Sequence, residues 1–207
     1  MNVKKIDKKL TCSQIKKAAI INAARLLFQK NGFKLTSMDD IAKQAGASKR
    51  TVYNHFASKE LLFNAIVGEM LDLLCHFEYV DFNIDLALDE QLTRLAENEL
   101  VLLKSEGVIK SSRVIISELL TSPELVEGAI QELNNRESPL VSWFRQAYSA
   151  GIIKSNYPEM VAEQFVAVIK GFCFWPQLIQ GEEFPTEEKQ KLVVEMAVNM
   201  IIKQYTA

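Results

Sequence analysis

Glycine and proline are scarce in this sequence, which holds 8 Gly and 5 Pro among its 207 residues. This scarcity excludes collagen-like and low-complexity chains and leaves room for long uninterrupted helices. Cysteine is scarcer still, because Cys12, Cys75 and Cys173 lie far apart and include no Cys-x-x-Cys pair. A disulfide framework and a zinc site are therefore not expected, and we predict no metal or other cofactor.

Long apolar runs are missing as well. Every apolar run falls far short of the ~18–20 residues that a membrane-spanning helix needs. The basic start MNVKKIDKKL is not followed by the apolar run and cleavage site of a secretory signal. Because isolated cysteines suit a reducing compartment, we expect a cytoplasmic protein with no membrane partner.

The chain as a whole has no large excess of either charge, because its formal net charge is −2. Its two parts, however, differ strongly in charge. Residues 1–67 hold 13 Lys and Arg against 4 Asp and Glu, a net charge of +9, and the remaining residues carry −11. A basic head on an acidic body indicates a polyanionic partner for the head alone. The alternative is a lysine-rich face that is merely solvated, and composition does not decide between the two.

Apolar side chains recur with helical spacing along most of the chain. Ile20, Ala24, Leu27 and Phe28, for example, form one stripe along a helix. No run alternates with the period of a strand. The pattern predicts an all-α fold of about nine helices, with the seventh interrupted near Ser138. The expected ranges are 13–30, 38–45, 48–55, 59–76, 87–105, 110–121, 123–150, 158–180 and 186–205.

The segment 36–60 combines two short helical patterns with a tight turn between them. Thr36 or Ser37 can cap the first pattern together with an aspartate three residues later, as in a capping box, and Ser48 can cap the second. Gly46 supplies the turn. Helix, glycine-containing turn and helix is the layout of a DNA-binding helix-turn-helix, whose second helix enters the major groove.

The outer face of the second helix carries groups that suit base edges. If Val52 points inward, Arg50 and Asn54 lie on the opposite side of the helix, where arginine can bind guanine and asparagine can bind adenine. Hydroxyl groups, helix N-termini and lysines suit phosphates, although Tyr53 and His55 have packing roles as alternatives. The predicted DNA-contacting residues are Thr36, Ser37, Ser48, Lys49, Arg50, Thr51, Tyr53, Asn54, His55 and Lys59.

Residues 23–66, AARLLFQKNGFKLTSMDDIAKQAGASKRTVYNHFASKELLFNAI, resemble the DNA-binding region of the TetR family of transcriptional regulators. The resemblance implies a DNA-binding domain at 13–58, with its helix-turn-helix at 37–56, and an effector-binding and dimerisation domain at 59–207. It also implies that the residues matching Thr36, Ser48, Thr51, Tyr53, His55 and Lys59 touch the DNA backbone. Those matching Lys49, Arg50 and Asn54 help to choose bases.

The stretch 144–183 resembles the C-terminal domains of AcrR-like and AefR-like members of this family. The resemblance implies that the helices near 158–180 and 186–205 form a four-helix bundle with a partner subunit. The run VVEMAVNMII is apolar on nearly all sides, which fits a second buried face against a partner. The alternative is a central core helix.

An effector site is expected where apolar and aromatic side chains surround a few polar groups. Plain core packing is the alternative for each candidate. Glu118 lies inside an apolar run, and we expect it on the surface or facing a cationic ligand. The candidate ligand-binding residues are Met70, Leu74, Phe77, Trp143, Phe144, Gln164, Phe165, Phe172 and Trp175.

These observations predict a homodimeric transcriptional repressor that binds palindromic operator DNA and is released by a small hydrophobic or amphipathic ligand. An activator or a ligand-independent regulator is an alternative. A more distant alternative is an all-helical enzyme or lipid-binding protein with a basic arm. Because no nucleophile–base pair, metal site or phosphate loop is visible in the sequence, we predict that the chain is not an enzyme.

Overall fold

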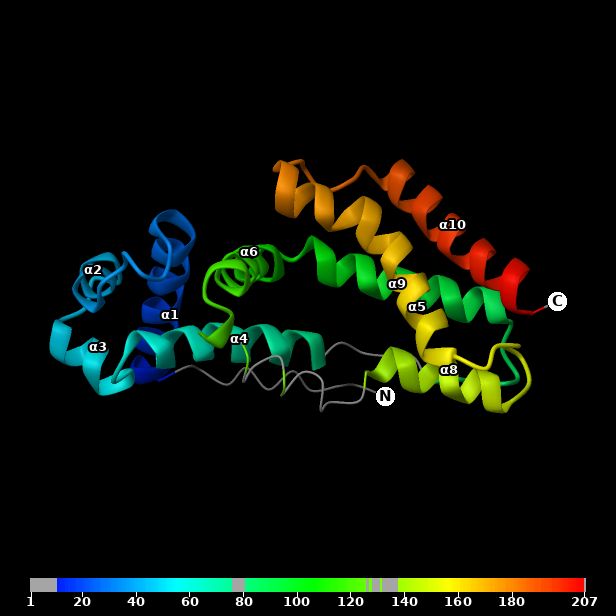
Figure 1. Cartoon of the computed structure of the whole chain (residues 1–207), viewed down its shortest axis with the longest axis horizontal. Helices are drawn as coiled ribbons and strands as arrows, with labels where there is room; N and C mark the ends of the chain where they lie inside the picture. Colours follow the sequence, from blue (N-terminus) through cyan, green and yellow to red (C-terminus); the bar gives the residue numbers. More distant parts are fainter. Residues whose placement is uncertain (1–10, 76–80, 126, 128–130, 132–137, 207) are drawn as a thin grey trace. The chain divides into compact units, whose positions relative to one another are not determined.

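The computed structural model of the chain describes residues 11–75, 81–125, 127, 131 and 138–206. Over these residues the chain forms nine α-helices and one short π-helix, η1, and no strand (Figure 1). The all-α prediction is confirmed. The elements are α1 (Cys12–Asn31), α2 (Met38–Gln44), α3 (Lys49–His55), α4 (Lys59–Cys75), α5 (Leu88–Lys104), α6 (Glu106–Thr121), α8 (Pro139–Ser149), α9 (Pro158–Cys173), η1 (Pro176–Gln180) and α10 (Glu187–Tyr205).

Two compact units divide the chain. The first comprises Met1–Glu69 and Val114–Val126, and the second comprises Met70–Arg113 and Glu127–Ala207. Helices α4 and α6 therefore each contribute residues to both units. The first unit extends beyond the range 13–58 expected for a DNA-binding domain, and a functional boundary at residue 58 stays a prediction.

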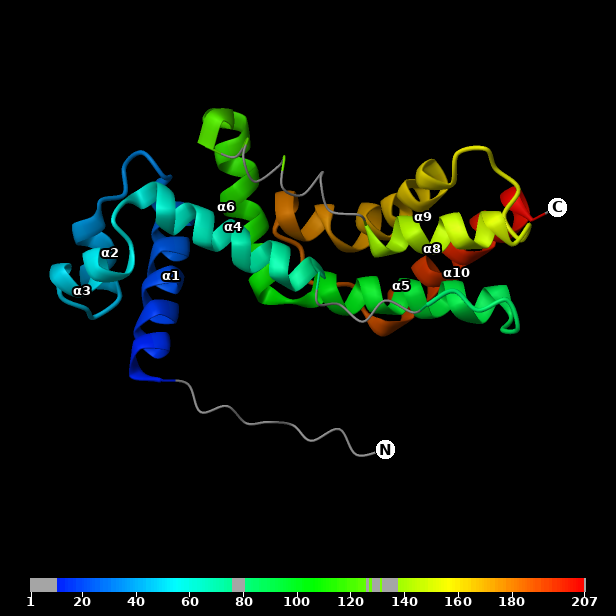
Figure 2. The same ribbon diagram turned by 90° about the horizontal axis from the view of Figure 1, so that it is seen from below.

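The first unit is built on the apolar stripe that the sequence shows in α1. Ile20 and Ala24 are fully buried, and Phe28 is 3% exposed. The Phe28 ring packs against that of Phe33, which in turn packs against that of Phe63, with ring centroids 5.2 and 5.8 Å apart. Helices α1, α2 and α3 lie next to one another in both views (Figures 1 and 2). This core fixes the position of the two short helices.

Glu118 belongs to the interior of the first unit, so the expected surface position is wrong. Its side chain is only 4% exposed. Its Oε1 accepts a hydrogen bond from the Phe33 amide at 3.0 Å. A buried carboxylate is stable when hydrogen-bond donors reach it, and the loop after α1 supplies this donor.

The second unit encloses one apolar core between α5, α8, α9 and α10. Trp143 and Phe144 of α8 and Phe165 of α9 are at most 1% exposed. The ring centroids of Trp143 and Phe144 are 5.0 Å apart, and those of Phe144 and Phe165 are 5.8 Å apart. Each of these aromatic rings buries a large apolar surface in the core of the unit.

Several helix ends differ from the sequence prediction. The helix expected at 158–180 is α9 followed by the π-helix η1, because Pro176 has no amide hydrogen and cannot continue an α-helical ladder. Helix α6 begins at Glu106, four residues earlier than expected. The predicted interruption near Ser138 is confirmed, since α8 starts with Pro139 as its first residue. None of the described helices is both long and apolar enough to span a bilayer.

Candidate nucleic-acid interface

The start of α2 is fixed by a capping box between Ser37 and Asp40. The Ser37 hydroxyl accepts a hydrogen bond from the Asp40 amide at 3.1 Å, and the Asp40 carboxylate accepts one from the Ser37 amide at 3.3 Å. The carboxylate also accepts a hydrogen bond from the Ser37 hydroxyl at 2.5 Å. These bonds hold the pKa of Asp40 below its usual value. Ser37 itself is exposed and remains a candidate for contact with DNA.

Thr36, by contrast, is part of the interior. Its side chain is 2% exposed, and its hydroxyl lies 2.8 Å from the Gly32 carbonyl and 3.2 Å from the Leu27 carbonyl. A buried hydroxyl needs an acceptor, and these two carbonyls supply it. The hydrogen bonding of Thr36 thus stabilises the turn between α1 and α2. The predicted DNA contact through this side chain does not fit that burial.

The turn between α2 and α3 has the expected chemistry. Gly46 has φ of 61°, in the left-handed region that glycine adopts readily. The Ser48 hydroxyl accepts a hydrogen bond from the Thr51 amide at 3.1 Å and so caps α3. The Ser48 and Thr51 hydroxyl oxygens are also 2.8 Å apart and share a hydrogen bond. The turn is thereby closed, and α3 begins at a defined point.

Helix α3 presents a polar face to the outside. Val52 is fully buried, whereas Arg50 and Asn54 are exposed and Tyr53 is 50% exposed. The orientation predicted from helical periodicity is therefore confirmed. A guanidinium, an amide and a phenol on one short exposed helix can donate to base edges and to phosphates.

One ion pair links α2 and α3 at the surface. The Lys49 ammonium lies 2.5 Å from the Asp39 carboxylate, and both side chains are more than half exposed. The hydrogen bond to Asp39 raises the pKa of Lys49. An exposed pair of this kind is weak and exchanges readily with other partners, so Lys49 remains able to reach a base or a phosphate.

His55 and Lys59 sit at the corner after α3, and both are half-buried. The His55 and Phe56 ring centroids are 6.5 Å apart. The Lys59 ammonium donates to the Phe33 carbonyl at 2.7 Å and to the Lys34 carbonyl at 3.3 Å. Lys59 thus ties α4 to the loop after α1, and its predicted contact with a DNA phosphate stays a prediction.

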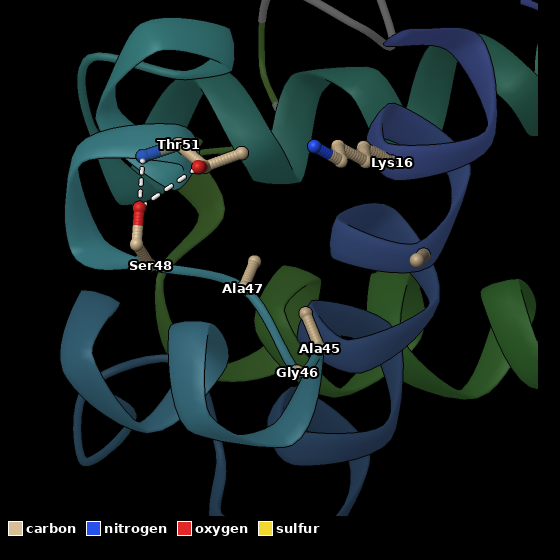
Figure 3. A pocket seen from close by; sticks show the side chains of 7 residues that line it. Lys16, Ala45, Gly46, Ala47, Ser48 and Thr51 are labelled. Atoms are coloured by element: carbon tan, nitrogen blue, oxygen red, sulfur yellow. Dashed lines mark hydrogen bonds between the residues drawn. The ribbon is translucent and has the colours of Figure 1, made fainter. Parts of the chain in front are cut away.

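A small notch lies beside the turn, and sequence reasoning missed one of its residues. Figure 3 shows Lys16 of α1 reaching towards Thr51, with the turn residues 45–48 along the same notch. Lys16 and Lys17 look alike in the sequence, and only the packing of α1 against the turn distinguishes them. Apolar periodicity in α1 shows which face is buried but not which exposed lysine faces the turn.

Of the predicted effector residues, only three aromatic side chains lie together in one environment. Trp143, Phe144 and Phe165 form a buried cluster, which Phe82 joins with its ring centroid 5.4 Å from that of Trp143. Met70 is half-buried, and its sulfur accepts a hydrogen bond from the Ser112 hydroxyl at 3.8 Å.

The remaining effector candidates lie elsewhere. Phe172 and Trp175 are 41% and 43% exposed. Gln164 is also exposed, and its Oε1 accepts a hydrogen bond from the Tyr205 hydroxyl at 2.5 Å. The Leu74 side chain and Phe77 are outside the described part of the chain. A ligand-binding role for these residues stays a prediction.

The fold and the exposed face of α3 define the chain as a helix-turn-helix protein. Two family models match it: bacterial regulatory proteins of the tetR family over residues 20–66, and the AefR-like transcriptional repressor C-terminal domain over residues 90–207. Among solved structures, a TetR family transcriptional regulator from Pseudomonas syringae pv. tomato str. DC3000 is 34% identical, with a TM-score of 0.82 over 95% of this chain and 98% of that one.

Two further relatives agree. The HTH-type transcriptional regulator RutR of Escherichia coli O157:H7 is 30% identical over 160 residues, which cover 72% of each chain. The solved structure of the flavonoid-responsive regulator FrrA is 28% identical, with a TM-score of 0.67 over 92% of this chain and 97% of that one. The chain therefore belongs to the TetR family of transcriptional regulators.

Proposed function

We propose that this DNA-binding transcriptional regulator is a homodimeric repressor that leaves a palindromic operator when a small hydrophobic or amphipathic ligand binds. The observation that carries the proposal is the outward face of α3, where Arg50 and Asn54 are exposed while Val52 is fully buried. A helix whose inner side anchors it and whose outer side carries paired donors fits the major groove. The proposed role is regulatory and not catalytic, and it places the protein with the chromosome in the cytoplasm.

The dimer is supported by apolar side chains left outside on α9 and α10. Met160 of α9 is 56% exposed, and Leu192 and Met196 of α10 are 55% and 45% exposed. Helices α9 and α10 pack against each other, so these exposed apolar side chains lie on two neighbouring helices. A second copy would remove this surface from water. It would also supply a second reading helix, which must sit about 34–36 Å from the first to read one side of the duplex.

Ligand release is supported by the buried aromatic cluster in the second unit. Trp143 is 1% exposed, and its indole N–H donates to no acceptor among the residues that the structure describes. Buried donors normally have a partner, so a ligand with an acceptor oxygen against Trp143 would satisfy this one. FrrA is described as flavonoid-responsive, and the C-terminal half of this chain matches an AefR-like repressor domain. A ligand that favours a form unable to fit DNA would lower operator occupancy by population shift.

The direct test is selection of duplexes from random DNA by the full chain. We expect an inverted repeat with half-sites one helical turn apart, bound by two chains as judged from the mass of the complex. Asn54→Ala should change the preferred base at one position of each half-site, because the amide is removed from the reading face. Gln29→Ala, at an exposed position of α1, is the matched control and should leave the selected sequence unaltered.

The result also separates the parts of the proposal. A selected site without symmetry, bound by one chain, would contradict the dimer. An Asn54→Ala variant that selects the wild-type sequence would contradict the assignment of α3 as the reading helix. Binding that no flavonoid or other amphipathic compound weakens would favour the ligand-independent regulator.

A further inference from the structure

One ring of the aromatic cluster around Trp143 is supplied by a loop. Phe144 and Phe165 belong to α8 and α9, whereas Phe82 lies in the loop of residues 81–87 that precedes α5. The half-buried Phe82 ring meets the Trp143 ring edge to face, with centroids 5.4 Å apart and an interplanar angle of 79°. A ring carried by a loop can leave the cluster without moving a helix, which the rings on α8 and α9 cannot do.

Gln91 of α5 fastens this loop to the second unit. Its side chain is 3% exposed. Its Oε1 accepts a hydrogen bond from the Asn83 amide at 2.9 Å, and its Nε2 donates to the Asn83 carbonyl at 2.8 Å and to the Leu86 carbonyl at 3.0 Å. All three bonds go to the backbone of residues 83–86, and none involves the Phe82 side chain. The Phe82 ring can therefore turn away from Trp143 while the loop stays attached.

The indole N–H of Trp143 is a buried donor without an acceptor among the residues that the structure describes. A buried tryptophan normally finds a partner for this group. The neighbouring rings of Phe82 and Phe144 consist of carbon and hydrogen and offer no oxygen to it. A ligand beside Trp143 that carried an oxygen acceptor would gain a hydrogen bond that these rings do not provide.

A buried cation is missing from the same unit. No lysine, arginine or histidine is among the buried residues that the structure describes there, and the buried polar residues of the unit are Gln91, Ser111, Ser112 and Gln177. A carboxylate ligand would lose its hydration in this interior without gaining a charged partner. The interior of the unit therefore favours a neutral ligand over an anionic one.

We propose that a neutral apolar molecule with one oxygen acceptor binds against Trp143, takes the place of the Phe82 ring and accepts a hydrogen bond from the indole. The inference rests on the proposed release by a ligand, and it narrows the ligand from hydrophobic or amphipathic to neutral. Burial of the apolar surface of the ligand supplies affinity. The indole N–H supplies the preference for an acceptor, as the few polar groups of apolar sites do.

The test follows the indole N–H signals of the full chain by NMR during titration with benzophenone, a neutral molecule with one carbonyl. The chain has two tryptophans, and Trp175, which is 43% exposed, is the internal control. We expect the Trp143 signal to shift and the Trp175 signal to stay. Diphenylmethane has the same two rings without the carbonyl and should bind about tenfold more weakly, because the hydrogen bond is missing. The anion para-benzoylbenzoate should also bind more weakly than benzophenone.

Three variants assign the roles of the side chains. Trp143→Phe removes the donor and keeps an aromatic ring, so it should abolish the preference for benzophenone over diphenylmethane. Phe82→Ala should bind benzophenone severalfold more tightly, because no ring has to be displaced. Ile84→Ala is the matched control on the same loop. Its side chain is 62% exposed, and the change should leave the affinity unaltered.

Several outcomes would overturn the inference. They are a Trp143 signal that benzophenone leaves unshifted up to its solubility limit, equal affinities of the wild-type chain for benzophenone and diphenylmethane, and weaker binding of benzophenone by Phe82→Ala than by wild type. Tighter binding of para-benzoylbenzoate than of benzophenone would contradict the neutral class. The first two comparisons use the wild-type chain, so they decide the matter even if a variant does not fold.

The proposed function is tested separately on the duplex selected from random DNA. If benzophenone shifts the Trp143 signal but leaves the duplex bound, the site stands and its role in release is contradicted. If para-benzoylbenzoate releases the duplex without shifting the Trp143 signal, release by a ligand stands and the site at Trp143 is wrong. A chain that selects no duplex contradicts the proposed function and leaves the binding site to be judged by NMR.

Discussion

The two compact units place their polar chemistry in opposite ways. In the first unit the candidate DNA-contacting groups are outside, as in Arg50 and Asn54 on α3, while the interior polar groups Thr36 and Glu118 close turns. In the second unit the candidate effector residues Trp143 and Phe165 are in the core. A site on an outer face contrasts with its surroundings, whereas a site inside a core has the same composition as the core itself.

The largest effect should come from removing one buried ring in each unit. Phe63 is fully buried in the first unit, and Phe165 is 1% exposed in the second. Each Phe→Ala change should lower the free energy of unfolding by about 3–5 kcal/mol through lost transfer energy and a cavity. Because the units have separate cores, we expect calorimetry to show two transitions, with each variant lowering one of them.

These two variants test whether the two units unfold separately. If Phe63→Ala and Phe165→Ala lowered the same single transition, the chain would unfold as one cooperative body. A matched change at the surface, Phe172→Ala, is the control. Its side chain is 41% exposed in the chain, so it should destabilise the second unit less than Phe165→Ala does.

The same contrast explains what could be predicted from the sequence. The outer face of α3 is predictable from one buried position, Val52, and helical geometry. The capping roles of Ser37 and Ser48 followed from local spacing. The setting of Lys59 is not predictable in this way, because the Phe33 and Lys34 carbonyls that it binds lie in the loop after α1 and only the fold brings them to α4. The acceptors of Thr36, the Leu27 and Gly32 carbonyls, lie where α1 ends, so its burial depends on how the chain turns there. The spacing of Lys16 and Lys17 likewise carries no sign of which one faces the turn.

In the second unit the limits were different. A ligand-binding role for the aromatic residues stays a prediction, and spacing does not separate buried Phe165 from exposed Phe172 seven residues later, although both lie in α9. The expected helix 158–180 extends beyond the end of α9 at Cys173, because Pro176 has no amide hydrogen to continue the α-helical hydrogen bonds. Glu118 is the case in which the tertiary structure most clearly changes what the sequence suggests. A carboxylate in an apolar run is expected at the surface, but it is buried because the Phe33 amide donates to it.

A smaller loss in the free energy of unfolding is expected from changes at Glu118, whose buried hydrogen bond lies in the first unit. Glu118→Ala would leave the buried Phe33 amide without an acceptor, at a cost of about 1–3 kcal/mol in the free energy of unfolding. Glu118→Gln keeps an acceptor oxygen and should cost less. Urea unfolding measures the difference, and hydrogen exchange at the Phe33 amide should accelerate in the alanine variant alone. Equal losses in both variants would mean that the hydrogen bond contributes little.

The smallest effect is a dependence of stability on pH that should have opposite sign in the two units. In the second unit, burial raises the pKa of Glu99 above its usual 4.5, although Lys170 at 3.7 Å opposes the shift. The folded state thus holds that proton more tightly than the unfolded state. The associated stabilisation is complete below 4.5 and is lost as the pH rises through the folded pKa. Glu99→Gln lacks this titration, so its stability relative to wild type should increase as the pH rises.

In the first unit, hydrogen bonds from Ser37 lower the pKa of Asp40 below its usual 3.8. The stabilisation from Asp40 is present above that value and is lost as the pH falls through the folded pKa. Asp40→Asn should therefore be less stable than wild type near neutrality, and the difference should shrink on acidification. Urea unfolding of both variants from pH 3 to pH 8 compares the two trends. If the stability differences of both variants from wild type changed with pH in the same direction, the opposite pKa shifts of Asp40 and Glu99 would be contradicted.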